Sequence, residues 1–204
     1  MNIVIVGHID HGKSSLIGRL LFDTESLPDS VLAEATRAGA AGGQVEFAHL
    51  VDSLEEERLQ NITIDTTQTF FKTSKRRYAI IDAPGHKEFL RNVSRGLEEQ
   101  SRRHASVLKL LGISNVLIAI NKMDLVDYSQ TKFEEMRGEV VSFFEKLGLP
   151  IRSITPISAM KGDNVAKATS NLSWCNSRTL VEQLDTLEDT RDESSFASRF
   201  VTQL

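Results

Sequence analysis

A glycine-rich segment near the amino terminus has the residue types and spacing of a phosphate-binding loop. It runs from Gly7 through Gly12 and Lys13 to Ser14 and matches G-x-x-x-x-G-K-S, with an apolar run before it and a helical pattern after it. The glycines let the backbone curl so that successive amides converge on phosphate groups. Lys13 can neutralise the β- and γ-phosphates of a nucleotide, and the Ser14 hydroxyl can bind Mg²⁺. The alternative, a chance glycine-rich turn, fits the flanking pattern poorly.

A second group of candidate catalytic residues follows the apolar segment that ends at Asp82. A carboxylate at the end of a strand can hold Mg²⁺ through water. Gly85 can bring a backbone N–H to the γ-phosphate, and His86 stands where an attacking water could be oriented. An aspartate at a strand end is more often an ordinary cap when it occurs alone. Its pairing with a phosphate-binding loop favours the metal-binding interpretation.

A third motif, N-K-M-D from Asn121 to Asp124, points to the base of the nucleotide. The Asp124 carboxylate can accept hydrogen bonds from the N1–H and exocyclic amine of guanine, which adenine cannot supply. A site built for these donors rejects the wrong base, because buried polar atoms would stay unpaired. Farther along, Ser158 and Ala159 could offer backbone amides to the guanine carbonyl. Each motif alone could be a polar turn, and their order along the chain is what favours GTP.

The apolar patterns predict strands alternating with helices, and therefore a mostly parallel sheet flanked by helices. Apolar runs predict strands, of which the second and third form a hairpin, at residues 2–6, 67–73, 76–82, 115–120 and 153–158. Helical periodicity is present in residues 13–22, 86–111, 133–147 and 179–187. The motifs fall where predicted strands end.

Composition narrows the classes of protein. With 204 residues, 40% of them hydrophobic and 25% charged, the chain can form one sizeable domain and a tail. A formal net charge of −4 gives no overall basic field, so we expect no direct nucleic-acid binding by this chain. The single cysteine, Cys175, excludes an internal disulfide framework. No apolar run approaches the roughly 20 residues of a membrane helix, so we expect no membrane contact and a cytoplasmic location.

The motifs GHIDHGKSS, NITID, DAPGH, NKMD and ISA, in this order, make the chain resemble the translation-factor class of GTPases. The resemblance implies the P-loop NTPase G-domain fold, an α/β fold, and hydrolysis of GTP to GDP with Mg²⁺. It implies that His86 is catalytic and positions water, and that the metal is held by Ser14, Thr63 and Asp82. The nucleotide would be bound by Gly7, His8, Ile9, Asp10, His11, Gly12, Lys13, Ser14, Ser15, Asp82, Gly85, Asn121, Lys122, Asp124, Ser158, Ala159 and Met160.

Within this class, LIGRLLFDTESLP and LVDSLEEERLQNITID look most like the GTPase subunit of bacterial sulfate adenylyltransferase. That likeness implies a regulatory GTPase module in sulfate activation, with the catalytic subunit of that enzyme as partner. The segment GHIDHGK is closer to elongation factors Tu and 1-alpha. The alternatives are therefore an elongation-factor-like G domain for aminoacyl-tRNA delivery and a remnant that binds a partner but hydrolyses little GTP.

The chain also departs from the family pattern. Asn61 replaces the glycine usual before I-T-I-D, although asparagine tolerates left-handed backbone better than most residues. Ile9 and Ile62 match apolar residues that flank the catalytic histidine in relatives, or they simply pack in the core. We expect residues 1–187 to form the GTP-binding G domain and residues 188–204 to form an acidic linker toward a missing β-barrel domain.

One departure affects the sheet itself. Asp82 and Asn121 are only 39 positions apart (121 − 82), and VSRGL bridges two segments that relatives separate by an apolar strand and its loop. A vacant slot would leave backbone groups buried and unpaired. We therefore expect strand 115–120 to slide beside strand 2–6, which leaves five strands. The slide would move the guanine-reading loop by one strand spacing, about 4.8 Å, and weaken the grip on GTP.

Overall fold

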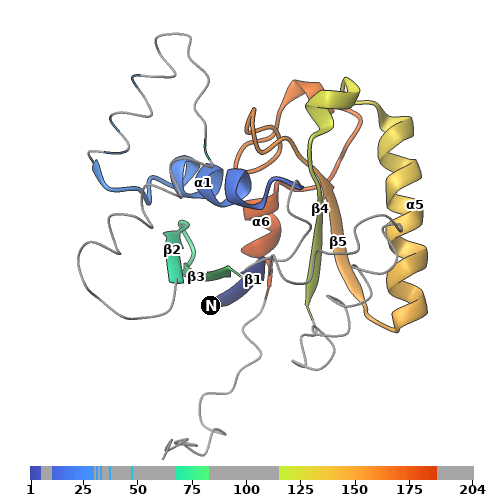
Figure 1. The fold of residues 1–204 in the computed structure, drawn as a ribbon, viewed down its shortest axis with the longest axis horizontal. Coiled ribbons are helices and arrows are strands. Elements are labelled where there is room, and N and C mark those ends of the chain that lie inside the picture. The colour runs from blue at the N-terminus through green and yellow to red at the C-terminus, as the bar shows by residue number, and fades with distance from the viewer. Residues whose placement is uncertain are drawn as a thin grey trace, which may run out of the picture.

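The computed structural model describes residues 1–5, 11–29, 31, 33, 37, 47, 68–82 and 115–187. The predicted helical segment 86–111, the mixed region between residues 48 and 67, and the tail 188–204 lie outside this part of the chain. The described elements are, in chain order, β1 (Asn2–Ile5), α1 (Lys13–Asp23), β2 (Gln68–Lys72), β3 (Arg77–Asp82), β4 (Val116–Ile120), η3 (Met123–Val126), α5 (Gln130–Leu147), β5 (Ile151–Pro156), η4 (Ser170–Leu172) and α6 (Leu180–Leu184). Figure 1 shows their arrangement.

The first sheet has the order β1-β3-β2. β1 runs parallel to β3, with Ile3 beside Ile80, and β2 runs antiparallel to β3. A short turn joins β2 to β3, in which Thr73 N donates to Arg76 O across 2.9 Å. The predicted hairpin is therefore confirmed, with each strand within a residue or two of its expected bounds.

The second sheet consists of β4 and β5, which run parallel with Ile118 beside Ile154. The prediction that strand 115–120 slides beside strand 2–6 is wrong. Among the residues with described placement, β4 pairs with β5 alone and β1 pairs with β3 alone. The five described strands therefore form two sheets instead of one.

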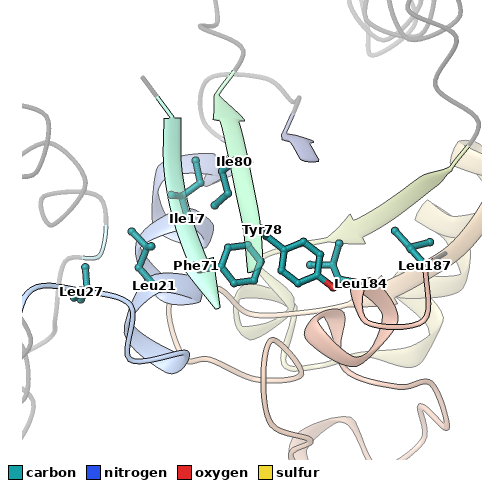
Figure 2. Close-up of a cluster of buried hydrophobic side chains, with 8 residues drawn as sticks. All are labelled: Ile17, Leu21, Leu27, Phe71, Tyr78, Ile80, Leu184 and Leu187. Atoms are coloured by element: carbon teal, nitrogen blue, oxygen red, sulfur yellow. The ribbon is translucent and has the colours of Figure 1, made fainter. Parts of the chain in front are cut away.

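Helices α1 and α6 pack against the described strands, none of which pairs from one sheet to the other. Their side chains pack with the first sheet in one cluster, formed by Ile17, Leu21, Leu27, Phe71, Tyr78, Ile80, Leu184 and Leu187. Figure 2 shows Ile17 and Leu21 of α1 on one side of the Phe71–Tyr78 pair, and on the other side Leu184 of α6 and Leu187, which follows that helix. A second cluster joins α1 to the chain after β5 and contains Leu20, Ile157, Val165 and Leu180, with Ala119 of β4 packed against it. This packing connects β4 and the chain after β5 to the first sheet through side chains of α1.

A buried carboxylate fixes α6 to the β2–β3 hairpin. Tyr78 is fully buried, its ring stacks on Phe71 at 4.8 Å between centroids, and its hydroxyl donates to Asp185 Oδ1 at 2.7 Å. Thr73 Oγ1 donates to the same oxygen at 2.8 Å. Burial, and next the hydrogen bond to Asp185, raise the pKa of Tyr78 well above its usual value.

The long helix α5 begins at a serine cap and ends at glycine. Ser129 Oγ accepts from Lys132 N, and Gly148 takes the left-handed conformation (φ 66°) that favours glycine after a helix. Of the predicted apolar stripe, Phe133 is buried, whereas Met136 is exposed. No helix in the described ranges has the length and apolar character needed to cross a membrane.

Candidate functional site

The structure brings together three of the segments that the sequence singled out. They are the end of the phosphate-binding loop with the start of α1, the loop after β4 and the loop after β5; Figure 1 shows the start of α1 beside the end of β4. The described site residues are His11, Gly12, Lys13, Ser14, Ser15, Asn121, Lys122, Asp124, Ser158, Ala159 and Met160. Outside the description lie Gly7, His8, Ile9, Asp10, Thr63, Gly85, His86 and the side chain of Asp82.

Asn121 connects all three segments through one side-chain amide. Its Nδ2 donates to the backbone oxygen of His11 at 3.0 Å. Its Oδ1 accepts from Lys122 N at 2.8 Å and from Ala159 N at 2.9 Å. Because strand 115–120 has not slid beside strand 2–6, the reason for expecting a displaced guanine-reading loop falls away, and a direct hydrogen bond joins that loop to the phosphate-binding loop. The sequence placed Asn121 at the nucleotide, and the structure adds this bridging role.

Glycine is required where the phosphate-binding loop meets Asn121. Gly12 has a φ of +79°, which other residues rarely adopt, and a Cβ there would lie 2.7 Å from Asn121 Nδ2. The Gly12 carbonyl accepts from Leu16 N at 2.9 Å and so begins α1. The first amides of α1, which belong to the Lys13–Ser15 segment, are the groups that the motif assigns to phosphate.

A serine orients the carboxylate that is expected to read the base. Ser158 Oγ donates to Asp124 Oδ1 at 2.7 Å and accepts from Lys161 N at 3.2 Å. Ser158 is fully buried and Asp124 is half-buried, so this contact is partly shielded from water. A carboxylate has a second oxygen with which it can accept further donors. The arrangement presents a fixed acceptor at the end of β4.

The two amides that the sequence suggested for the guanine carbonyl are already hydrogen-bonded within the protein. Ser158 N donates to Asp163 O at 3.0 Å, and Ala159 N donates to Asn121. Their part in base recognition stays a prediction. In this structure both amides brace the loop after β5.

The loop after β4 contains an unusual number of left-handed residues. Lys122, Asp127 and Tyr128 have φ values of 66°, 50° and 55°. This conformation costs a residue with a Cβ on the order of 1 kcal/mol and persists where surrounding contacts impose it. One such contact is Met123, which is buried and whose N–H donates to Ile157 O at 3.2 Å. The base-reading turn is therefore held by its packing.

Sequence reasoning missed a contact between Tyr128, at the end of this turn, and Asp163, in the loop after β5. The hydroxyl of Tyr128 donates to Asp163 Oδ2 at 2.5 Å. Burial, and next the hydrogen bond to Asp163, raise the pKa of Tyr128 to about 12. They stand 35 positions apart, and no motif spacing signals such a pair. In the sequence, the neighbouring Gly162 indicates a turn at Asp163 but does not indicate its partner. In the structure, Asp163 is a buried polar residue.

Helix α1 also contacts the loop after β5 through Arg19. Gly162 has a φ of +81°, and a Cβ there would lie 2.0 Å from Arg19 Nη2. Arg19 Nε forms an ion pair with Asp23 at 2.9 Å, and the guanidinium lies 4.9 Å from the Phe47 ring centroid. The helix after the phosphate-binding loop is thereby fitted to the base-reading side of the site.

The expected Mg²⁺ ligands can be compared with the strand register. β1 and β3 run parallel with Ile5 beside Asp82, so Asp82 lies at the edge of the sheet from which the phosphate-binding loop departs. A serine hydroxyl and an aspartate are oxygen ligands of the kind Mg²⁺ prefers, and in this respect the residues fit the ion. In the ranges given above, no group of three or more His, Cys, Asp or Glu residues could hold a metal ion by itself. A surface groove of about 620 Å³ between α5 and β5 contains none of the predicted site residues.

Comparison with known proteins places the chain in a family. The sequence model of the elongation factor Tu GTP binding domain matches residues 1–99 and 93–190, and the two matches meet where the sequence predicts a missing strand. Elongation factor 1-alpha of Thermococcus celer is 41% identical over 205 residues, which covers 93% of this chain and 48% of that protein. The chain thus spans about half the length of the curated relatives it matches.

Solved structures agree on the fold. The crystal structure of sup35 complexed with GDP superposes with a TM-score of 0.65 at 27% identity and covers 91% of this chain and 44% of that one. Sup35 complexed with GMPPNP gives a TM-score of 0.64 at 26% identity, with coverage of 92% and 44%. The α/β fold with a mostly parallel arrangement of strands is that of a G domain. The chain belongs to the family of elongation factor Tu GTP-binding domains.

Proposed function

We propose that this chain binds GTP and, with Mg²⁺, hydrolyses it to GDP and phosphate as the G domain of an elongation-factor-like protein. The observation that carries the proposal is the Asn121 side chain, which joins the phosphate-binding loop to both base-reading loops. Such a link sets the distance between the phosphate and base subsites, which a single nucleotide must span.

The residues at the start of α1 and at the base-reading loops have separate parts in this proposal. Lys13 and the first amides of α1 hold the phosphates. The Asp124 carboxylate, kept in place by Ser158, accepts the N1–H and amine of guanine. Adenine has no hydrogen on N1 and no amine at C2, so its binding would leave a desolvated carboxylate unpaired.

Hydrolysis requires one water molecule and no covalent intermediate. His86 orients the water, whose oxygen attacks the γ-phosphorus while the bond to the β–γ bridging oxygen breaks and GDP leaves. Ser14, Thr63 and Asp82 would hold the metal. When bound, Mg²⁺ neutralises charge on the phosphate oxygens.

The broader role that the comparisons favour is translation. The relatives named above include elongation factor 1-alpha at 41% identity, which supports the elongation-factor alternative over the sulfate-activation hypothesis. The sulfate-activation hypothesis rests on sequence stretches such as LIGRLLFDTESLP alone. Delivery of aminoacyl-tRNA is accordingly the process in which we place this G domain, with residues 1–187 as the nucleotide-binding unit and 188–204 as the linker that follows it.

Titration with fluorescent mant-GTP and mant-ATP, with and without Mg²⁺, tests the proposal. We expect Mg²⁺-dependent binding of the guanine nucleotide and a preference over adenine of at least about 10²-fold, followed by phosphate release. Equal binding of both nucleotides would overturn the assignment of the base. Tight GTP binding without any phosphate release would leave a binding module and remove the hydrolytic step.

A further inference from the structure

A hydrogen bond between Tyr128 and Asp163 joins the two base-reading loops at a point beyond the predicted motifs. Tyr128 ends the turn that carries Asp124, and its hydroxyl donates to Asp163 in the loop after β5. We propose that Tyr128 is a positioning residue for guanine recognition, because this bond holds the turn that carries Asp124 against the 158–163 loop. The inference rests on the proposed function and adds a residue to it.

We call the Tyr128–Asp163 hydrogen bond the clamp, and contacts within the protein fix Asp163 at one end of it. Its carboxylate is buried, and its second oxygen accepts from Asn171 Nδ2 at 3.3 Å. Its backbone oxygen accepts from Ser158 N at 3.0 Å, and Ser158 in turn donates to Asp124. A continuous set of contacts therefore runs from Tyr128 through Asp163 and Ser158 to Asp124.

Tyr128 closes this set of contacts into a ring. Its backbone N–H donates to Met123 O at 2.9 Å, at the start of the same turn as Asp124. Its backbone oxygen accepts from Trp174 Nε1 at 2.9 Å. The side chain, the N–H and the carbonyl of Tyr128 are thus all engaged, which fixes the residue in space.

The backbone of the turn explains why the clamp is needed. Asp127 and Tyr128 are consecutive left-handed residues, and neither is glycine. Such a pair tends to relax toward ordinary backbone angles when its contacts are removed. Relaxation would carry Asp124 with it, and hydrogen bonds weaken steeply when donor and acceptor separate by a few tenths of an ångström. Loss of the clamp should therefore weaken base recognition without touching the nucleotide directly.

The chain contains a matched control for the Tyr128→Phe variant. Tyr78 also donates its hydroxyl to a buried carboxylate, Asp185 Oδ1, at 2.7 Å, but it lies in the first sheet, among α6 and the β2–β3 hairpin. Tyr78→Phe removes the same group from the same kind of pair. Both variants should lower the melting temperature, so that stability alone does not separate them.

The decisive measurements are the release rate of mant-GDP and the ratio of affinities for GTP and ITP, which lacks the exocyclic amine. We expect Tyr128→Phe to speed release by about tenfold and to lower the GTP-to-ITP ratio, since part of a charge-assisted contact is lost. Tyr78→Phe should leave both values unchanged. Asp163→Asn keeps an acceptor oxygen for Tyr128 and should fall between wild type and Tyr128→Phe. Equal values for Tyr128→Phe and Tyr78→Phe would overturn the inference.

A second readout separates this inference from the proposed function. Amide hydrogen exchange in the nucleotide-free protein should rise in segments 121–128 and 157–163 for Tyr128→Phe and stay at the wild-type level there for Tyr78→Phe. If the wild-type chain binds no guanine nucleotide, the proposed function fails, and with it the role of Tyr128 in recognition. If the wild type binds but exchange and release do not respond to Tyr128→Phe, only the positioning role fails.

Discussion

The amide nitrogen of Asn121 lies so close to Gly12 that a Cβ on Gly12 would come within 2.7 Å of it. Two loops that are more than a hundred residues apart in sequence are therefore in van der Waals contact as well as hydrogen-bonded. If the proposed function holds, this closeness keeps the phosphate-binding and base-reading loops within reach of one nucleotide, although the two sheets are not paired in the described part of the chain.

Gly12→Ala should weaken GTP binding strongly. The new methyl group would displace Asn121, and alanine would have to adopt the left-handed conformation of Gly12. Together these effects should cost about 1–3 kcal/mol, or roughly 5- to 150-fold in affinity. Gly138→Ala is the control, because nothing lies within 4 Å of a Cβ there and the site is inside α5. That control should gain about 0.5–1 kcal/mol in unfolding free energy. Nucleotide titration and thermal melting of both variants check the contrast, and unchanged GTP affinity in Gly12→Ala would contradict it.

Asp124→Asn should exchange one base preference for another. An amide can no longer accept two hydrogen bonds from guanine, which costs on the order of 2–3 kcal/mol or roughly 30- to 150-fold. Xanthine carries an oxygen where guanine has its amine, so relative affinity for xanthosine triphosphate should rise. Competition titrations measure both changes. An unaltered affinity for GTP would remove Asp124 from the site.

His86→Ala should separate chemistry from binding. GTP affinity should stay near the wild-type value, while single-turnover hydrolysis should slow by about 10²-fold, the usual scale for a positioned catalytic group. Ser14→Ala should show the opposite pattern, with weaker Mg²⁺-dependent binding. If His86→Ala hydrolyses bound GTP at the wild-type rate, the histidine has no part in the mechanism.

Stability at alkaline pH should report the Tyr128 hydroxyl. Its pKa is raised from 10.0 to about 12, so the neutral form is favoured in the folded state. The resulting stabilisation is complete below pH 10 and is lost as the pH rises from 10 through 12. The difference in unfolding free energy between wild type and Tyr128→Phe should therefore shrink across that interval. Denaturant melts at pH 9, 10, 11 and 12, in a Tyr78→Phe background, measure it. A difference that stays constant would contradict the assigned pKa.

Insertion of an apolar strand after Gly96 should stabilise the chain. Within the described ranges, β1 and β4 each have one strand edge without a strand partner, and an inserted strand can pair with both. Since about 1 kcal/mol corresponds to roughly 2–4 °C for a chain of this size, we expect a melting temperature at least about 4 °C higher. GTP affinity should change by less than about threefold, because Asn121 already aligns the two subsites. A melting temperature equal to that of the unmodified chain would show that the two edges need no partner.

Some of these features could be predicted from sequence and others could not, for physical reasons. The strands and helix α1 were predictable because their apolar patterns are local. The motif spacing that singled out Asn121 and Asp124 is local as well, and their contact with a nucleotide stays a prediction. Helix α6 is shorter than the predicted segment 179–187. A capping box of Thr179 and Glu182 begins it, and it ends at Leu184. The arrangement of the described strands in two sheets could not be predicted from local patterns. Helix α1 packs against residues more than a hundred positions away, and such contacts leave no local signal in the sequence.

The same limit applies to the polar contacts. Nothing in the local pattern around Tyr128 or Asp163 shows that they meet, because a hydrogen bond across 35 positions leaves no periodic signal. The bridging role of Asn121 was missed for a related reason. Its motif predicts contact with a nucleotide, whereas its partners in the protein are the backbone of His11 and Ala159.

Helix α1 belongs to both hydrophobic clusters, with Ile17 and Leu21 in one and Leu20 in the other. We therefore expect α1 to couple the two described sheets in unfolding, so that they melt in one transition. An anion bound at the amino end of α1 should accordingly slow amide exchange in β2 and β5 to the same degree, although neither strand contains a predicted site residue.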